Sequence, residues 1–306
     1  MVGALLLSVA LAIATPSPAD DANIKLSMAI VQRIGDRLWP QWSKAPFAID
    51  LITPDGPVLV NVDKPFTPPS FPPNFEATFP LSNGVPTIVI GVPQYSKSTP
   101  VRWSVTLIHE HFHQWQDSWP QYVAATEKLG LAKPGDKNAM WMLNYPFPYQ
   151  DARIDSGFAA MSNALADAID AIGKSNFKQK AGAYFAARHR FEASLKPNDY
   201  RYFAFQCWQE GVARYTEIAA PRLAVAAHAN DPTFLTDAQA IALKEDADQT
   251  YARVLKRLRT IRLNQDERSN FYAVGAAEAL LLDELSPNWR ARYLDPRMDL
   301  SVYFPG

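Results

Sequence analysis

The chain has 306 residues, of which 48% are hydrophobic and 20% are charged, and its formal net charge is −1. This is ordinary globular composition, and the near-neutral charge gives no indication of a nucleic acid partner or an anionic membrane surface. The single cysteine, Cys207, excludes a disulfide-stapled secreted module and is best interpreted as a small buried hydrophobe.

Residues 1–19 predict a secretory signal peptide, which would place the mature protein in the periplasm or outside the cell. An uncharged apolar run covers residues 3–14, and residues 12–14 and 17–19 both fit a cleavage site of small residues. The run is too short for a membrane span, so we expect no stable membrane insertion after cleavage. No Lys or Arg follows Met1, which leaves open an apolar leader without an export role.

The part from residue 20 to residue 98 is expected to contain a small sheet. Apolar residues recur at helical spacing in one segment, 22–39. Alternating or continuous apolar runs predict three strands, at 47–52, 58–62 and 86–92. The Pro- and Phe-rich segment 64–80 is expected to be irregular.

The part from residue 99 to residue 306 is expected to be mainly helical. Thr99 and Pro100 predict an N-cap and a first helical residue for a helix that runs to about Asp117. Further helices are predicted at 151–172, 178–194, 199–220, 237–263 and 270–285. The simplest architecture is a single α+β domain over residues 20–306, with a site between the sheet-containing and helical parts.

His109, Glu110 and His113 form a His-Glu-x-x-His pattern on the helix that begins at Pro100. Successive residues turn by about 100°, so the two imidazoles lie one turn apart on one face and can reach one metal ion. Glu110 projects beside them and can accept a proton from a water on that ion. The alternative is a core helix with incidental histidines, but such side chains are unfavourable to bury without partners.

A catalytic zinc takes three protein ligands, so a third is expected on a later helix. His111 lies on the opposite helix face, and Gln116 and Trp119 occupy the positions where metzincins have Gly and His. Glu210 is the best candidate because Gly211 and Ala213 would let its helix approach closely. Glu217, two turns further on, is expected to orient a metal histidine. The other acidic candidates are Glu127, Asp151, Asp155, Glu192 and Glu278.

With these residues the chain resembles the gluzincin metallopeptidases, in which a later helix supplies a glutamate, in several branches within Glu-Gly-x-Ala. The matching residues are His109, Glu110, His113 and the segment 210–213. The resemblance implies a zincin-like domain, zinc, Glu110 as general base and hydrolysis of an amide bond. The chain departs from the best-known gluzincins in its long gap between His113 and Glu210, and in having Arg214 where Asp is common.

The expected function is therefore a secreted or periplasmic zinc metallopeptidase acting on a peptide or protein. Tyr272 and Tyr215 are the candidate donors to the oxyanion, and Arg214 is expected to bind a substrate carboxylate or to pair with Glu210 or Glu217. The strand at 87–92 offers an edge to an extended peptide. Aromatic residues near the motif are expected to line a cleft or fill the core: Trp103, Phe112, Trp115, Trp119 and Trp141.

Two alternatives remain open at this point. One is a zinc hydrolase acting on a substrate other than a peptide, with the same metal ligands. The other is a non-catalytic zinc-containing binding protein. Glu110 argues against this alternative, because a purely structural zinc site needs no general base.

Overall fold

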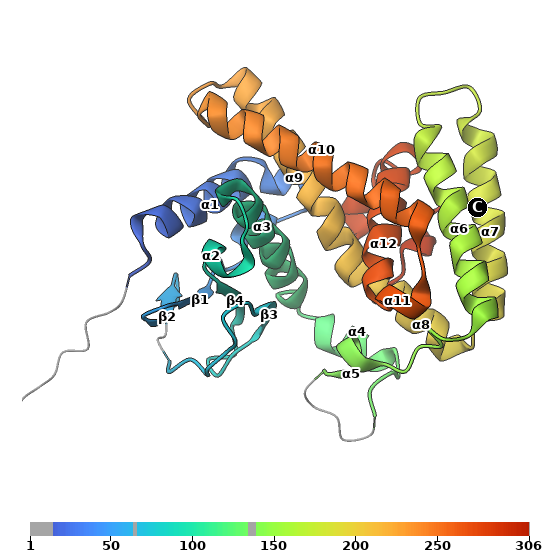
Figure 1. Cartoon of the computed structure of the whole chain (residues 1–306), viewed down its shortest axis with the longest axis horizontal. Helices are drawn as coiled ribbons and strands as arrows, with labels where there is room; N and C mark the ends of the chain where they lie inside the picture. Colours follow the sequence, from blue (N-terminus) through green and yellow to red (C-terminus); the bar gives the residue numbers. More distant parts are fainter. Residues whose placement is uncertain (1–14, 64–65, 134–138, 306) are drawn as a thin grey trace, which may run out of the picture.

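The computed structural model describes residues 15–63, 66–133 and 139–305. Its N-terminal part is a helix followed by a four-stranded sheet (Figure 1). The elements are α1 (Pro18–Leu38), η1 (Trp42–Lys44), β1 (Ile49–Thr53), β2 (Gly56–Val60), β3 (Glu76–Pro80), β4 (Pro86–Gly91) and α2 (Pro93–Ser96). The strand order is β2-β1-β4-β3; β1 and β4 are parallel and the other two pairs are antiparallel.

One face of the sheet packs against α3 (Pro100–Asp117). Ile49 and Leu51 alternate along β1 towards a small apolar core that also contains Trp103 and Leu107 of α3. The indole nitrogen of Trp103 donates a hydrogen bond to the carbonyl of Gly91, at 2.9 Å. This packing fixes the orientation of α3 relative to the end of β4.

The remaining chain is helical and covers the opposite side of α3. Its elements are α4 (Tyr122–Lys128), α5 (Trp141–Asn144), α6 (Ala152–Asp170), α7 (Phe177–Ser194), α8 (Pro197–Gln206), η2 (Cys207–Gly211), α9 (Val212–Asn230), α10 (Asp237–Thr260), α11 (Leu263–Asp266), α12 (Ser269–Leu285), η3 (Trp289–Arg292) and η4 (Leu300–Tyr303). Helices α6 and α7 form a hairpin at the far end of the molecule, whereas α9 lies next to α3, α10 and α12 (Figure 1). Helix α3 therefore lies between the sheet and the helical part.

This arrangement confirms the predicted α+β class and the predicted long helices other than the one at 199–220, with ends that shift by a few residues. The region of that helix is divided into α8, η2 and α9. The helix at 100–117 begins where the cap signal placed it, because the Thr99 hydroxyl accepts a hydrogen bond from the backbone N–H of Arg102. The aromatic residues around the motif belong largely to the core: Trp103, Phe112, Trp115 and Trp141 are buried, and Trp119 packs against them.

Three expectations are wrong. Part of the segment 64–80 is not irregular, because residues 76–80 form the edge strand β3. The strand at 86–91 offers no edge, since β1 and β3 pair with its two sides. The helix expected to stop at Ala220 continues to Asn230 through Pro221, which is itself buried, as are Ala220 and Ala224 of the same helix.

Of the predicted leader, residues 1–14 lie outside the described residues. Ser17 caps α1, and its hydroxyl oxygen accepts a hydrogen bond from the backbone N–H of Asp20. Pro18 and Ala19, within the second predicted cleavage site, already belong to the first turn of this helix. None of the helices in the described residues combines the length and apolar character needed to cross a membrane.

Candidate metal centre

Three donor atoms converge where α3 meets the turn η2. The Nε2 atoms of His109 and His113 are 3.2 Å apart, and Glu210 Oε2 lies 3.4 Å from His113 Nε2 and 3.9 Å from His109 Nε2. Tetrahedral zinc with ligand distances of about 2.0–2.2 Å requires donors about 3.3–3.6 Å apart. The observed separations of 3.2, 3.4 and 3.9 Å lie close to this range, so the three side chains could hold a metal ion such as zinc. They are the one such group of His, Cys, Asp and Glu in the described residues.

The other nitrogen of each histidine ring is held by a neighbour. His109 Nδ1 lies 2.7 Å from Glu217 Oε1, and His113 Nδ1 lies 2.7 Å from Gln116 Oε1. The amide nitrogen of Gln116 donates to the hydroxyl of Tyr293 at 2.7 Å, so the amide oxygen must face the histidine. Both rings thus donate from Nδ1, and Nε2 is the atom of each ring that faces the other donors.

Glu217 is buried, and two arginines keep it ionised. Arg214 Nη1 lies 2.8 Å from Glu217 Oε2, and Arg102 of α3 forms a second ion pair with the same oxygen. Burial favours the neutral acid, but these guanidinium groups and the hydrogen bond from His109 hold the pKa of Glu217 well below its usual range. A charged acceptor at this position stabilises the tautomer of His109 that metal binding needs.

Glu210 is presented by a π-helical turn that crosses α12 at very short range. A Cβ on Gly211 would lie 2.4 Å from the Cα of Gly275, and a Cβ on Gly275 would lie 2.3 Å from the carbonyl oxygen of Cys207. Only glycines allow this approach. Turns of this type are frequent at functional sites, and here the crossing brings Glu210 towards both α3 and α12.

Glu210 and His113 form a buried charge pair. Burial disfavours the charged form of each, yet the carboxylate of Glu210 raises the pKa of His113 to about 9, and His113 lowers that of Glu210 to about 2. Burial lowers the pKa of His109, which accordingly stays neutral. A metal ion bound here would displace the Nε2 proton of His113 and would take its place as the positive charge beside Glu210.

Glu110 lies beside these donors and is bound by the edge strand. The hydroxyl of Thr78 on β3 donates to Glu110 Oε2 at 2.7 Å and to its backbone carbonyl at 3.1 Å. Burial raises the pKa of Glu110 to about 7, although the nearby charge of His113 opposes the shift. A carboxyl that titrates near neutrality suits proton transfer in both directions. The role of Thr78 was missed because its segment was expected to be irregular.

The structure places Tyr272 and Tyr215 in different surroundings. Burial and the neighbouring charge of Glu210 raise the pKa of Tyr272 well above its usual value. Its hydroxyl also accepts a hydrogen bond from Arg268 at 3.0 Å. Tyr215 is buried among aromatic rings, and its hydroxyl bonds to Asp283 at 2.6 Å and Arg290 at 2.7 Å, away from the three donors.

The other acidic candidates have separate roles or lie elsewhere. Asp151 caps α6, Asp155 accepts a hydrogen bond from the backbone of Leu263, and Glu278 is paired with Arg188. Glu127 lies on α4 and Glu192 lies on α7. His111, expected to pack or bond at the helix surface, is instead fully buried; its ring stacks on Phe47 with centroids 4.2 Å apart.

Comparison of the chain with known protein families, characterised proteins and solved structures finds no match. The function must therefore be inferred from the geometry of the site.

Proposed function

We propose that the chain is a zinc-dependent metallopeptidase of the gluzincin kind. The observation that carries the proposal is the convergence of two Nε2 atoms and one carboxylate oxygen from distant elements, with Glu110 beside them. Both histidines are oriented by polar neighbours, as metal-binding histidines generally are. His109, His113 and Glu210 would hold the ion, which when bound lowers the pKa of a water molecule and polarises a carbonyl.

The protein's own groups divide the proton transfers between them. Glu110 accepts a proton from the attacking water and returns it to the leaving amine, and its pKa near 7 favours both steps. Thr78 orients this carboxyl through its hydroxyl. Tyr272, whose high pKa keeps it protonated, is the better placed of the two tyrosines to donate to an oxyanion.

The position of β3 favours a peptide substrate. This strand pairs with β4 on one side and is the last strand of the sheet in the described residues. Its Thr78 contacts Glu110, so the strand runs alongside the candidate centre. An extended peptide can add to such an edge through main-chain hydrogen bonds, which would align its backbone with Glu110.

The alternatives are a zinc hydrolase acting on another substrate and a zinc-containing protein without turnover. A purely structural zinc site usually has four protein ligands, whereas the described residues supply three and place a near-neutral carboxyl beside them. This favours catalysis. Together with the apolar leader at residues 1–19, it supports a peptidase that acts in the periplasm or outside the cell.

The test combines metal content with peptide hydrolysis. Wild type should contain about one zinc per chain, and Glu210→Ala should lose it, whereas Glu127→Ala, on α4, should retain it. Glu110→Gln should keep zinc and lose cleavage of a peptide library, and the exposed control Glu245→Gln should keep both. Zinc retained in Glu210→Ala would disprove the assigned ligand set. A zinc-loaded wild type that cleaves no peptide would favour the other hydrolase.

A further inference from the structure

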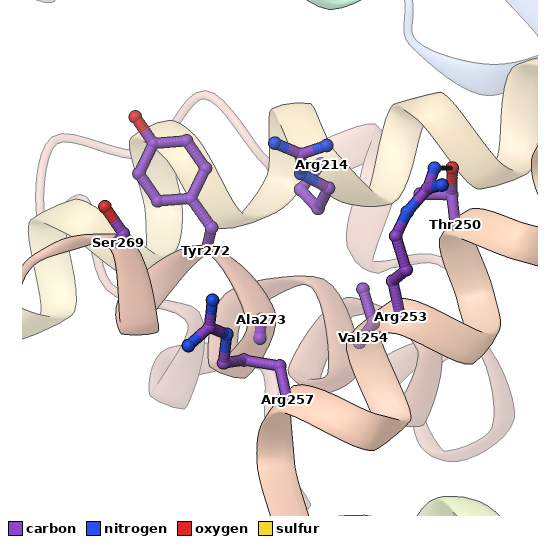
Figure 2. A pocket seen from close by; sticks show the side chains of 8 residues that line it. All are labelled: Arg214, Thr250, Arg253, Val254, Arg257, Ser269, Tyr272 and Ala273. Carbon is purple, nitrogen blue, oxygen red and sulfur yellow. Dashed lines mark hydrogen bonds between the residues drawn. The ribbon is translucent and has the colours of Figure 1, made fainter. Parts of the chain in front are cut away.

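A hollow of about 300 Å³ opens beside the candidate centre, between α9, α10 and α12 (Figure 2). Its lining is unusually rich in guanidinium groups. Arg214 comes from α9, Arg253 and Arg257 come from α10, and Tyr272 enters from α12. Two hydroxyls, from Thr250 and Ser269, complete the polar part of the lining, and no carboxylate is among the lining residues.

The three arginines differ in how far their charge is compensated. Arg214 pairs with Glu217, which also serves Arg102 and His109, and Arg257 pairs with Asp266. Arg253 is exposed, and its guanidinium donates a hydrogen bond to the hydroxyl of Thr250 at 2.7 Å. Among the residues that the structure describes, no carboxylate lies at ion-pair distance from Arg253. Its guanidinium therefore keeps donors and a full charge for a ligand.

The hollow is continuous with the candidate centre through shared side chains. Tyr272 lines the hollow and accepts a hydrogen bond from Arg268 Nη1, which lies 4.0 Å from Glu210 Oε1. Arg214 lies over the ring of Tyr272, with the guanidinium carbon 5.8 Å from the ring centroid, and it also holds Glu217 beside His109. A ligand group in the hollow thus lies next to whatever occupies the metal centre.

We propose that this hollow is an anion subsite that binds a carboxylate of the substrate close to the scissile bond. The inference rests on the proposed peptidase function and adds a specificity to it. Arginine side chains match carboxylates in geometry, and hydroxyls of the lining supply further donors. The carboxylate comes either from an acidic side chain or from the C-terminus of a peptide, and the two sources predict different cleavage products.

The experiment uses pairs of peptides that are cleaved by the zinc-loaded wild type. In one pair, Glu is replaced by Gln beside the cleaved bond; in the other, the free C-terminus is replaced by an amide. In one of the two pairs, kcat/KM for the peptide with the carboxylate should exceed that for its uncharged partner by about tenfold or more. This ratio corresponds to the free energy of one charge-assisted hydrogen bond. Arg253→Gln should reduce that ratio towards one, whereas Arg190→Gln on the exposed face of α7 should preserve it.

A second measurement does not depend on turnover. In calorimetric titrations of the metal-free chain at constant ionic strength, wild type and Arg190→Gln should bind succinate with equal affinity. The affinity of Arg253→Gln should be at least about tenfold lower. Equal succinate affinity in all three chains, with no preference for either acid, would overturn the subsite. Absence of any peptide cleavage would instead reject the proposed function, and weakened succinate binding in Arg253→Gln would still support an anion site.

Discussion

The crossing of η2 and α12 makes Gly275→Ala a sharp test of how Glu210 is positioned. The new Cβ would lie 2.3 Å from the carbonyl oxygen of Cys207, where ordinary contact begins near 3.4 Å. The two backbones must therefore separate by about 1 Å, because neither contact atom can rotate away. Glu210 belongs to the displaced turn, whereas His109 and His113 stay on α3.

The expected result has two parts. Overpacking of this kind destabilises a fold by about 1–3 kcal/mol, and the better helix propensity of Ala offsets about 1 kcal/mol of it. Zinc affinity should fall at least about tenfold, because a functional site tolerates misplacement of only about 0.5 Å. Gly182→Ala is the matched control: it lies within α7 and its Cβ would meet nothing within 4 Å, so only the propensity gain of up to about 1 kcal/mol remains.

The assays are urea unfolding of both variants and zinc dissociation constants from competition with a chromophoric chelator. The unfolding comparison stands whether or not the chain binds zinc. If Gly275→Ala were as stable as Gly182→Ala and its zinc dissociation constant equalled that of wild type, the close crossing would not position Glu210.

Three further predictions follow from the same contacts. Glu217→Gln should lower zinc affinity about 10–100-fold in the chelator assay, because His109 loses a charged acceptor; unchanged affinity would contradict this role. Zinc at about 1,000 times its dissociation constant should raise the free energy of unfolding by about 4 kcal/mol, and a chelator or Glu210→Ala should remove that gain. The third concerns Asp50, which is buried with both oxygens unpartnered; burial raises its pKa from 3.8 to about 6. Folded Asp50 then holds its proton up to a higher pH than the unfolded chain does, so stability should fall by about 2 kcal/mol as the pH rises from 4.5 to 7.5. Asp50→Asn should lack this decline in urea unfolding at pH 4.5 and 7.5, and an equal decline in both proteins would assign it to other groups.

The parts of the fold that carry a strong local signal were predictable. The helix at 100–117 has a cap, a proline at its first position and a long apolar face, and all three act within a few residues of one another. Glu210 was identifiable because small neighbours at 211 and 213 indicated close helix packing. The strand β3 could not be predicted from the sequence. Apolar and polar residues alternate only weakly along its five positions, these positions are largely half-buried or exposed, and they follow a run of prolines.

The rest of the site depends on contacts between distant segments. A π-helical turn inserts one residue into an otherwise continuous helical pattern, which leaves no mark in the apolar spacing around Cys207. Gln116 served only to exclude a metzincin motif, yet it orients His113. Thr78 and Arg268 were missed for the same reason, because nothing in their local sequence connects them with Glu110 or Tyr272.

The hydrogen bond between Gln116 and Tyr293 joins positions 177 residues apart. Tyr293 in turn donates to the backbone carbonyl of Trp208, which belongs to η2, the turn that carries Glu210. A chain that ends with α9 therefore contains all three donors, but not the residue that orients Gln116. We therefore expect the orientation of His113, and with it the final geometry of the three donors, to depend on the folding of the last segment of the chain onto η2.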